Sequence, residues 1–355
     1  MDNLTHSLCG WTLARAGLNR YGKWVTPLLI LTANLPDLET VLLPGGSRAA
    51  YLLYHRGITH SPAMLTFYAL LFGALLWFLE RRARTSPALR FFPAVGICAA
   101  GLFSHLLLDW FNSYGVRPGL PFDSTWFYGD LLFIVDPWVW LLFALPIFMG
   151  STFDRNSVAA WVVAVLITTV IVCVAVNVNL VPWPAIIIWL SVIGFAILLR
   201  HRAKADEARC ARGGLLVLGL YMVLVFAASR TALERGKASI EAAIPGAARE
   251  LIKTSVMPYP AEPWRYDVLL QTSDTLSQVS VNLFGSDAIL QPGVKLHLDD
   301  PALDKIRGTL EYRAWRSFAR HPYVVRQGNV LILGDLRFKT RGGDWTRQRV
   351  EIPLD

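Results

Sequence analysis

FFPAVGICAAGLFSHLLLDW, residues 91–110, is an apolar run that ends in two ionisable side chains. Residues 91–108 carry one polar ionisable group, His105, and as a helix they are long enough to cross a bilayer core of about 30 Å. Asp109 follows four residues after His105, so the run ends in the pattern H-x-x-x-D. We therefore expect a membrane helix that presents an imidazole and a carboxylate on one face at its end.

Apolar runs of similar length occur elsewhere in the first 230 residues. They are residues 62–79, 133–150, 158–176, 183–199 and 213–229. Two earlier runs, residues 5–18 and 24–43, are shorter or interrupted by polar groups, and they predict a polar helical hairpin partly within the membrane. Taken together, these runs predict an all-α polytopic membrane helical bundle over residues 1–230.

The composition excludes several classes of protein. Of 355 residues, 54% are hydrophobic and 17% are charged, which is typical of neither a disordered chain nor a coiled coil. The formal charge is +8, but the basic residues fall largely in short loops between apolar runs, so no nucleic-acid partner is expected. The four cysteines, Cys9, Cys98, Cys173 and Cys210, are not paired in spacing, so neither a disulfide framework nor a cysteine metal site is expected.

Loop charge predicts an orientation. Arginines and lysines gather at residues 80–90 and 200–212, and Arg155 lies in a third loop. By the positive-inside rule these loops are cytoplasmic, which places the N-terminus and everything after residue 229 on the other face of a bacterial-type inner membrane. No cleaved signal peptide is expected, because no basic start precedes an apolar run with a small-residue cleavage site.

From residue 231 onward the composition becomes mixed and polar. Alternating patterns predict strands at residues 266–272, 278–283, 330–336 and 348–352. Residues 301–320 predict an amphipathic helix, and the proline-rich residues 258–264 predict an extended linker. We therefore expect a small C-terminal α+β domain, residues 231–355, outside the membrane.

The polar residues of the membrane half all fall, by the loop-charge argument, at the outer ends of the helices. They are His6, Asp37, His55, His60, His105 and Asp109. Mixed imidazole and carboxylate ligands suit zinc or another divalent first-row ion, so these six residues predict a site for one or two such ions.

Local sequence indicates how some of these groups are held. Ser61-Pro62 fits a helix N-cap followed by proline, which fixes the loop that carries His55 and His60. Pro36 breaks the second helix before Asp37. Arg56 lies between the two histidines, and a guanidinium there would bind an anionic group of a substrate.

Each candidate also has an ordinary structural role. His6 alone would be a solvated or capping residue, Asp37 a helix end, and His105 the partner of a backbone carbonyl. Asp136 before Pro137 first indicates an N-cap. Glu39 is a secondary candidate, and Asp130 is left open with Asp136. The arrival of four histidines and two aspartates at one membrane face favours function, because ionisable groups at membrane depth are costly.

The chain contains an ordered series of motifs: M-D-x-x-T-H-S from residue 1, N-x-P-D-x-E from residue 34, H-R-G-x-T-H-S from residue 55, H-x-x-x-D-x-x-N-S-Y-G from residue 105, and later W-F-Y-G-D and D-P-W. This series resembles that of the YdjM-like family of membrane-bound, metal-dependent hydrolases. The resemblance implies an inner-membrane hydrolase whose polar motif positions are the six residues above. Glu39 stands where an aspartate is common. The order of ligand types is also similar to that of the all-helical zinc phospholipases C and related nucleases, although no match to their later ligands follows Asp109.

The predicted function is a membrane-embedded, divalent-metal-dependent hydrolase that acts on a lipid or phosphoester at the outer membrane face. Asp37 or Asp109 would serve as general base, Arg56 would orient the anionic group, and membrane lipids are the expected partners. Two alternatives stay open. A metal-ion or proton transporter would need polar groups through the bilayer, which the runs at 158–176 and 183–199 hardly offer. A non-catalytic scaffold would close a structural metal site with four protein ligands.

Overall fold

The computed structural model describes residues 1–42, 46–84, 88–151, 154–202, 206–285, 288–339 and 344–353. The chain is mostly helical up to residue 243, and its strands all follow residue 252. Two compact units emerge from the contacts within the chain. The first comprises residues 1–36, 58–226 and 259–263, and the second comprises residues 37–57, 227–258 and 264–355.

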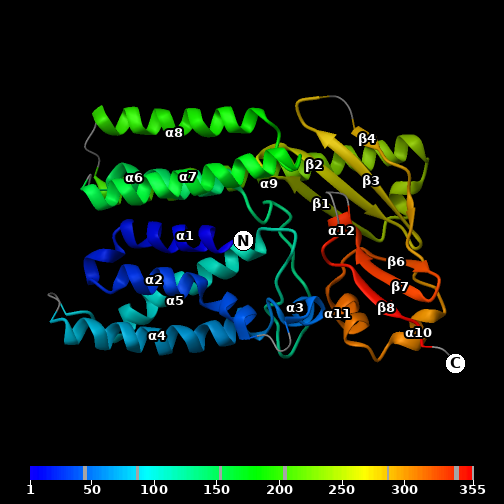
Figure 1. Ribbon diagram of the computed structural model, residues 1–355, viewed down its shortest axis with the longest axis horizontal. Helices are drawn as coiled ribbons and strands as arrows, with labels where there is room; N and C mark the ends of the chain where they lie inside the picture. The colour runs from blue at the N-terminus through cyan, green and yellow to red at the C-terminus, as the bar shows by residue number, and fades with distance from the viewer. Residues whose placement is uncertain are drawn as a thin grey trace. The chain divides into compact units, whose positions relative to one another are not determined.

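The first unit is built of helices (Figure 1). They are α1 (Asn3–Arg15), η1 (Leu18–Tyr21), α2 (Val25–Asn34), η4 (Ile58–His60), α4 (Pro62–Arg82), α5 (Phe91–Trp110), α6 (Pro137–Gly150), α7 (Arg155–Asn177), α8 (Pro184–Arg202) and the first part of α9 (Glu207–Ala243). The 3-10 helix η2 (Leu35–Leu42) continues α2, and the division between the units falls within it.

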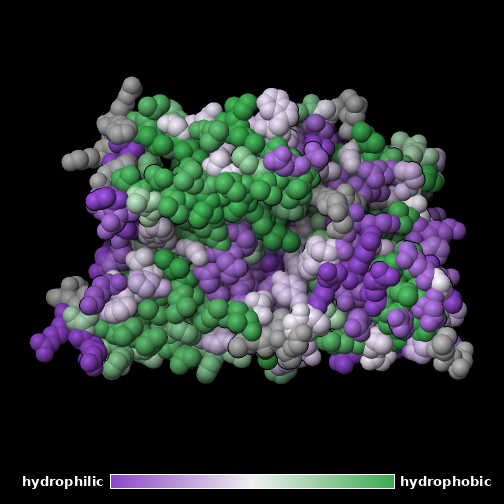
Figure 2. All heavy atoms as spheres, in the orientation of Figure 1, coloured by the Kyte–Doolittle hydropathy of each residue, from purple (hydrophilic) through white to green (hydrophobic). Residues whose placement is uncertain are grey.

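Among the described residues, four helices are long and apolar enough to cross a membrane. They are α4, α5, α7 and α9, while α6 and the apolar part of α8 are shorter. Many large apolar side chains on these helices are exposed, such as Leu166 on α7 and Phe226 on α9. Figure 2 shows hydrophobic side chains gathered over the helices, and hydrophilic ones are more frequent over the strands. Such a surface is typical of helices that lie in lipid.

Helix starts in the first unit are fixed by side-chain caps. Ser61 Oγ accepts a hydrogen bond from the backbone N–H of Met64, with Pro62 at the first helical position, as the sequence predicts. Asp136 caps α6 by accepting from the backbone N–H groups of Trp138 and Val139. These two caps fix the direction in which the chain enters α4 and α6.

Two glycines let α1 and α5 approach α2 closely. A Cβ at Gly10 of α1 would lie 2.7 Å from the carbonyl oxygen of Leu29 in α2. A Cβ at Gly101 of α5 would lie 2.3 Å from the hydroxyl oxygen of Thr32. Because only glycine fits at both positions, the backbones of α1 and α5 can both approach that of α2 closely.

The last helix of the first unit extends further than expected. The apolar run predicts an end near Ser229, whereas α9 continues to Ala243. Its later turns carry Ala232, Leu233 and Ile240, which are buried against strand residues such as Val268. The helix continues because this apolar stripe has a sheet to cover.

The second unit contains two antiparallel sheets. The first has the order β1-β2-β3-β4, with β5 also paired to β3, and the second has the order β6-β7-β8. The strands are β1 (Lys253–Tyr259), β2 (Glu262–Gln271), β3 (Thr275–Asn282), β4 (Ala288–Leu290), β5 (Val294–Lys295), β6 (Pro322–Gln327), β7 (Val330–Asp335) and β8 (Gln348–Glu351). The predicted α+β character is confirmed for this part of the chain.

Two local predictions for the C-terminal part of the chain are wrong. Residues 258–264 are no linker, because they hold the end of β1 and the start of β2; Pro258 lies in β1, at the edge of the sheet, and Pro263 lies at the start of β2. The single helix expected at residues 301–320 is two, α10 (Ala302–Ile306) and α11 (Leu310–Phe318), the second of which is capped by Thr309. The remaining helices of the second unit are α3 (Arg48–Tyr54), η5 (Ala247–Arg249) and α12 (Leu336–Lys339).

Candidate metal centre

One imidazole, that of His105 at the C-terminal end of α5, is oriented by a backbone carbonyl of α2. His105 Nδ1 lies 2.8 Å from the carbonyl oxygen of Ala33 in α2. A carbonyl only accepts, so Nδ1 carries the proton and Nε2 of the neutral ring carries the lone pair. This arrangement of a ring nitrogen and an outer acceptor is the one that metal-binding histidines usually have.

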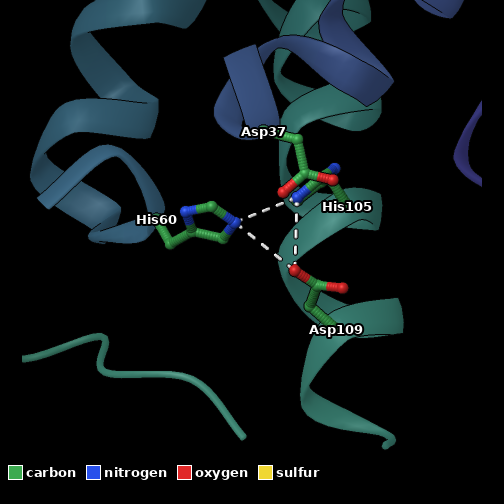
Figure 3. A group of neighbouring side chains, drawn as sticks. All are labelled: Asp37, His60, His105 and Asp109. Carbon is green, nitrogen blue, oxygen red and sulfur yellow. Dashed lines mark hydrogen bonds and ion pairs between the residues drawn. The ribbon is translucent and has the colours of Figure 1, made fainter. Parts of the chain in front are cut away.

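A second imidazole and a carboxylate face the same point. His60 Nε2 lies 3.1 Å from His105 Nε2, and each of these nitrogens lies 3.3 Å from Asp109 Oδ2 (Figure 3). His60 Nδ1 in turn lies 3.0 Å from the hydroxyl oxygen of Thr59. All three side chains of the triangle are fully buried. Two imidazoles cannot turn lone pairs on one another at this distance unless a proton or a cation lies between them.

Asp37 completes a group of four. Among the described residues, one ligand atom each from Asp37, His60, His105 and Asp109 lie within 4.8 Å of one another. Figure 3 shows Asp37 entering from η2, where Pro36 and the change from α-helix to 3-10 helix end α2. Four of the six predicted site residues are therefore brought together by segments that lie far apart in the sequence.

His6 reaches the same aspartate from α1. Its Nε2 lies 3.4 Å from Asp109 Oδ1, and its ring stacks on that of His105 with centroids 3.8 Å apart. The side chain is fully buried, and within the described part of the chain neither ring nitrogen has a hydrogen-bond partner. The α-amino group of Met1 also contacts Asp109 Oδ1. The two oxygens of Asp109 thus face two different sets of nitrogen atoms.

Three atoms of this group have the spacing expected of ligands to a zinc ion. Ligand atoms held about 2.0–2.1 Å from a tetrahedral zinc ion lie about 3.3 Å from one another. The triangle of His60, His105 and Asp109 has edges of 3.1, 3.3 and 3.3 Å. Two imidazoles with two carboxylates are also the mixture that zinc and similar first-row ions accept, and the unpartnered nitrogens of buried His6 add further donors beside them. These residues therefore form a candidate metal centre.

His55 and Arg56 both contact Glu39. His55 Nδ1 lies 3.3 Å from Glu39 Oε1, and its ring stacks on Tyr51 with centroids 4.5 Å apart. The backbone N–H of Arg56 donates to the same Glu39 oxygen at 2.6 Å. Arg56 is buried and has a φ of +54°, a conformation that costs free energy for a residue with a side chain. Glu39 thus stabilises the turn between the two histidines by contacting both the His55 ring and the backbone N–H of Arg56.

The loop after α5 contains further buried polar residues, among which the sequence alone did not single out Arg117. Arg117 is 4% exposed, and its guanidinium lies 4.4 Å from the centre of the Trp126 ring. Asn112 Oδ1 accepts from the backbone N–H of Tyr114. Asp130 is also buried, with a φ of +53°. The motif N-S-Y-G could have indicated the Asn112 turn, but a single arginine in a loop gives no signal of burial.

Comparison with known proteins gives a family. The model of the YdjM inner membrane protein family matches residues 1–181. The chain belongs to this family. The match covers α1 to α7 and all six predicted site residues, and it confirms the membership of the YdjM family that the ordered motifs indicate.

One curated relative is similar over a shorter part. It is YfhP of Bacillus subtilis (strain 168), described as an uncharacterized protein, with 28% identity over 115 residues. The match covers 31% of this chain and 31% of the relative, so it spans about a third of either protein. No solved structure matches the chain.

Proposed function

We propose that this YdjM-family protein is a polytopic inner-membrane hydrolase that depends on a divalent metal ion. The observation that carries the proposal is the buried triangle of His60 Nε2, His105 Nε2 and Asp109 Oδ2, with edges of 3.1 to 3.3 Å. Buried ionisable groups without an evident structural purpose are a mark of functional sites, most of all in a membrane segment.

His60, His105, Asp109 and Asp37 would hold the ion, and His6 would add a donor at the second oxygen of Asp109. A bound zinc ion lowers the pKa of water and polarises a phosphoryl or carbonyl oxygen. The carbonyl of Ala33 and the hydroxyl of Thr59 hold the two imidazoles in orientation.

Other residues of the chain would act on the substrate. Asp37 comes from a different segment than the triangle, and in place of a ligand role its carboxylate would take a proton from water. Arg56, held by Glu39 in a strained turn, would bind an anionic group such as a phosphate. These roles favour a phosphoester, and the apolar helices that carry the site favour one attached to a lipid.

The charge of the loops supports an orientation for this proposal. Arginines at residues 80–90 and 200–212 favour a cytoplasmic position of those loops by the positive-inside rule. The metal centre, the N-terminus and the C-terminal sheets would then lie on the non-cytoplasmic side of the inner membrane.

The test combines metal analysis with turnover. The full chain, purified in detergent without chelator, should hold one or two divalent ions per chain and hydrolyse a short-chain phospholipid or an aryl phosphodiester. Chelation and His105→Ala should both abolish turnover, whereas His55→Ala should leave the metal in place. Protein that carries no metal, or turnover that survives both chelation and His105→Ala, would refute the proposal.

The same preparations separate the two alternatives. Metal uptake into sealed liposomes that is lost in His105→Ala, without any turnover, would indicate a transporter. A stoichiometric metal that supports folding, with neither turnover nor transport, would indicate a structural site.

A further inference from the structure

A cavity of about 390 Å³ lies within the first unit, between α1, α6, α7 and α8. Its walls include Leu4 and Leu8 of α1, Ala144 of α6, Val165 of α7 and Ala196 of α8. The volume is in the range of small-molecule binding sites. None of the site residues described above lines it.

The cavity presents hydrocarbon because its polar groups bond elsewhere. Three tryptophans line it, and the indole N–H of each donates to another group: Trp140 to Asp2 and Thr5, Trp161 to Ser151, and Trp189 to Thr169. Only ring faces and aliphatic side chains are left to contact an occupant. A water molecule needs two to four polar partners, so water is a poor occupant here.

The surroundings supply a different occupant. α7 is long and apolar enough to span a membrane, and its residues beside the cavity, such as Val162 and Leu166, are more than half exposed. In a bilayer these side chains contact lipid, and the acyl chains of phospholipids are the main hydrocarbon there. The apolar cavity between these lipid-facing helices is therefore close to phospholipid acyl chains, which are apolar like its walls.

Helix α1 connects the cavity to the metal centre. Leu4 and Leu8 line the cavity, while His6 between them in sequence lies on Asp109. Trp140, which lines the cavity, donates its indole N–H to Asp2, the cap of α1. One short helix thus has an apolar face toward the cavity and an imidazole toward the site.

We propose that this cavity binds one acyl chain of a membrane phospholipid. The cavity holds the chain between α1, α6, α7 and α8, and the polar head of the lipid lies toward the ends of these helices. The assignment of this lipid as the substrate rests on the proposed function, whereas the binding of its chain does not.

Photolabelling of the full chain in lipid nanodiscs tests the proposal. The probe is phosphatidylglycerol with a diazirine in one acyl chain, at a few per cent of the lipid. Adducts should form on Trp189, which lines the cavity and is 3% exposed, as well as on Val163, which faces outward and does not line it. The ratio of Trp189 to Val163 adducts reports occupation of the cavity apart from lipid at the surface.

Variants that fill the cavity from opposite walls should lower that ratio. We expect at least a fivefold decrease for Ala144→Phe and for Ala196→Phe, and less than a twofold change for Ala160→Phe, at an exposed position of α7 that does not line the cavity. Two filling variants keep the test valid if one of them fails to fold. An equal ratio in all four proteins, or no adduct on Trp189, would overturn the proposal.

Two further arms separate the possible causes. Excess undecaprenyl phosphate that removes the Trp189 adducts, where unlabelled phosphatidylglycerol does not, would overturn the choice of an acyl chain. The double variant His60→Ala/His105→Ala should keep the adducts, because its changes lie outside the cavity. Labelling of the cavity in protein that holds no metal would leave this proposal standing while the proposed hydrolase fails, and the reverse result would do the opposite.

Discussion

Two fully buried histidines, His105 in α5 and His321 before β6, have opposite environments. His321 has a neutral partner on each ring nitrogen, with Ser255 Oγ 2.7 Å from Nε2 and Gln271 Oε1 2.7 Å from Nδ1. His105 Nδ1 has a backbone carbonyl as its partner, while its Nε2 faces another imidazole and a carboxylate. Both side chains are equally buried, so the difference lies in the partners of their ring nitrogens.

The difference separates a structural histidine from a candidate ligand. The amide oxygen of Gln271 only accepts, so His321 Nδ1 donates to it and Nε2 accepts from the Ser255 hydroxyl. Every donor in this network meets an acceptor. At His105, Nε2 lies beside a ring nitrogen of His60 and a carboxylate oxygen of Asp109, and one cation could bind all three atoms. A buried histidine is therefore interpreted from what its second nitrogen faces.

The largest expected effect is the loss of metal on His105→Ala. Removal of one corner of the triangle should lower metal affinity by more than about 100-fold, since loss of even an orienting partner costs roughly 10- to 100-fold. Metal content after gel filtration, measured by plasma mass spectrometry, checks this. His55→Ala is the control, because His55 pairs with Glu39 and lies outside the group of four. Equal metal in both variants would show that the two environments do not differ in the way described.

A stability effect is expected for the other histidine. His321→Asn should lower the free energy of unfolding of the C-terminal region by about 3 kcal/mol, because the Ser255 hydroxyl and the Gln271 amide lose their buried partner. Urea-dependent proteolysis, followed on peptides of β1 and β6, measures this free energy. His297→Asn at an exposed position with a φ of +50° should have little effect. Loss of metal in His321→Asn protein that is still folded would contradict the assignment of this histidine to structure.

Acid should destabilise the same region through His321. Burial lowers the pKa of His321 to about 3, from an ordinary value of 6.5. In the unfolded chain this imidazole is protonated as the pH falls below 6.5, whereas in the folded chain it stays neutral. The free energy of unfolding therefore decreases as the pH falls. Between pH 6.5 and pH 5 the loss should be about 2 kcal/mol. The same proteolysis assay over this window should give a flatter pH dependence for His321→Asn, and an unchanged slope would argue against a neutral buried imidazole.

The smallest effect concerns an orienting hydroxyl. Thr59→Val keeps the shape of the side chain but removes the oxygen 3.0 Å from His60 Nδ1, so metal affinity should fall about tenfold. A competition titration with a fluorescent zinc chelator measures this. Glu39→Gln is the control and should change affinity less than twofold, because Glu39 contacts the turn at Arg56 and not the group of four. A larger effect for Glu39→Gln would place Glu39 among the metal ligands.

Much of the centre could be predicted from sequence because it depends on local patterns. H-x-x-x-D places His105 and Asp109 on one helix face, and Ser61-Pro62 fixes the start of α4 beside His60. The contact between His105 Nδ1 and the carbonyl of Ala33 could not be predicted, because a backbone acceptor has no residue type. Nor does the spacing of His55 and His60 indicate that one of them turns toward Glu39.

The fold shows the same limit. Apolar runs predict the helices α4, α5 and α7 well, because length and hydrophobicity decide whether a helix can lie in lipid. They mislead at residues 258–264, where three prolines indicate a linker but the chain forms a hairpin of β1 and β2. Strand pairing depends on partners elsewhere in the chain, and local composition does not carry that information.

The contact of His105 with Ala33 makes use of a helix end. Ala33 lies in the last turn of α2, where carbonyls have no amide partner within the helix. That spare acceptor draws on the Nδ1 proton and makes the opposite nitrogen more basic. If the last turn of α2 frayed, the affinity for the ion would therefore fall before the protein unfolded. Metal affinity would then report on the local stability of the C-terminal turn of α2.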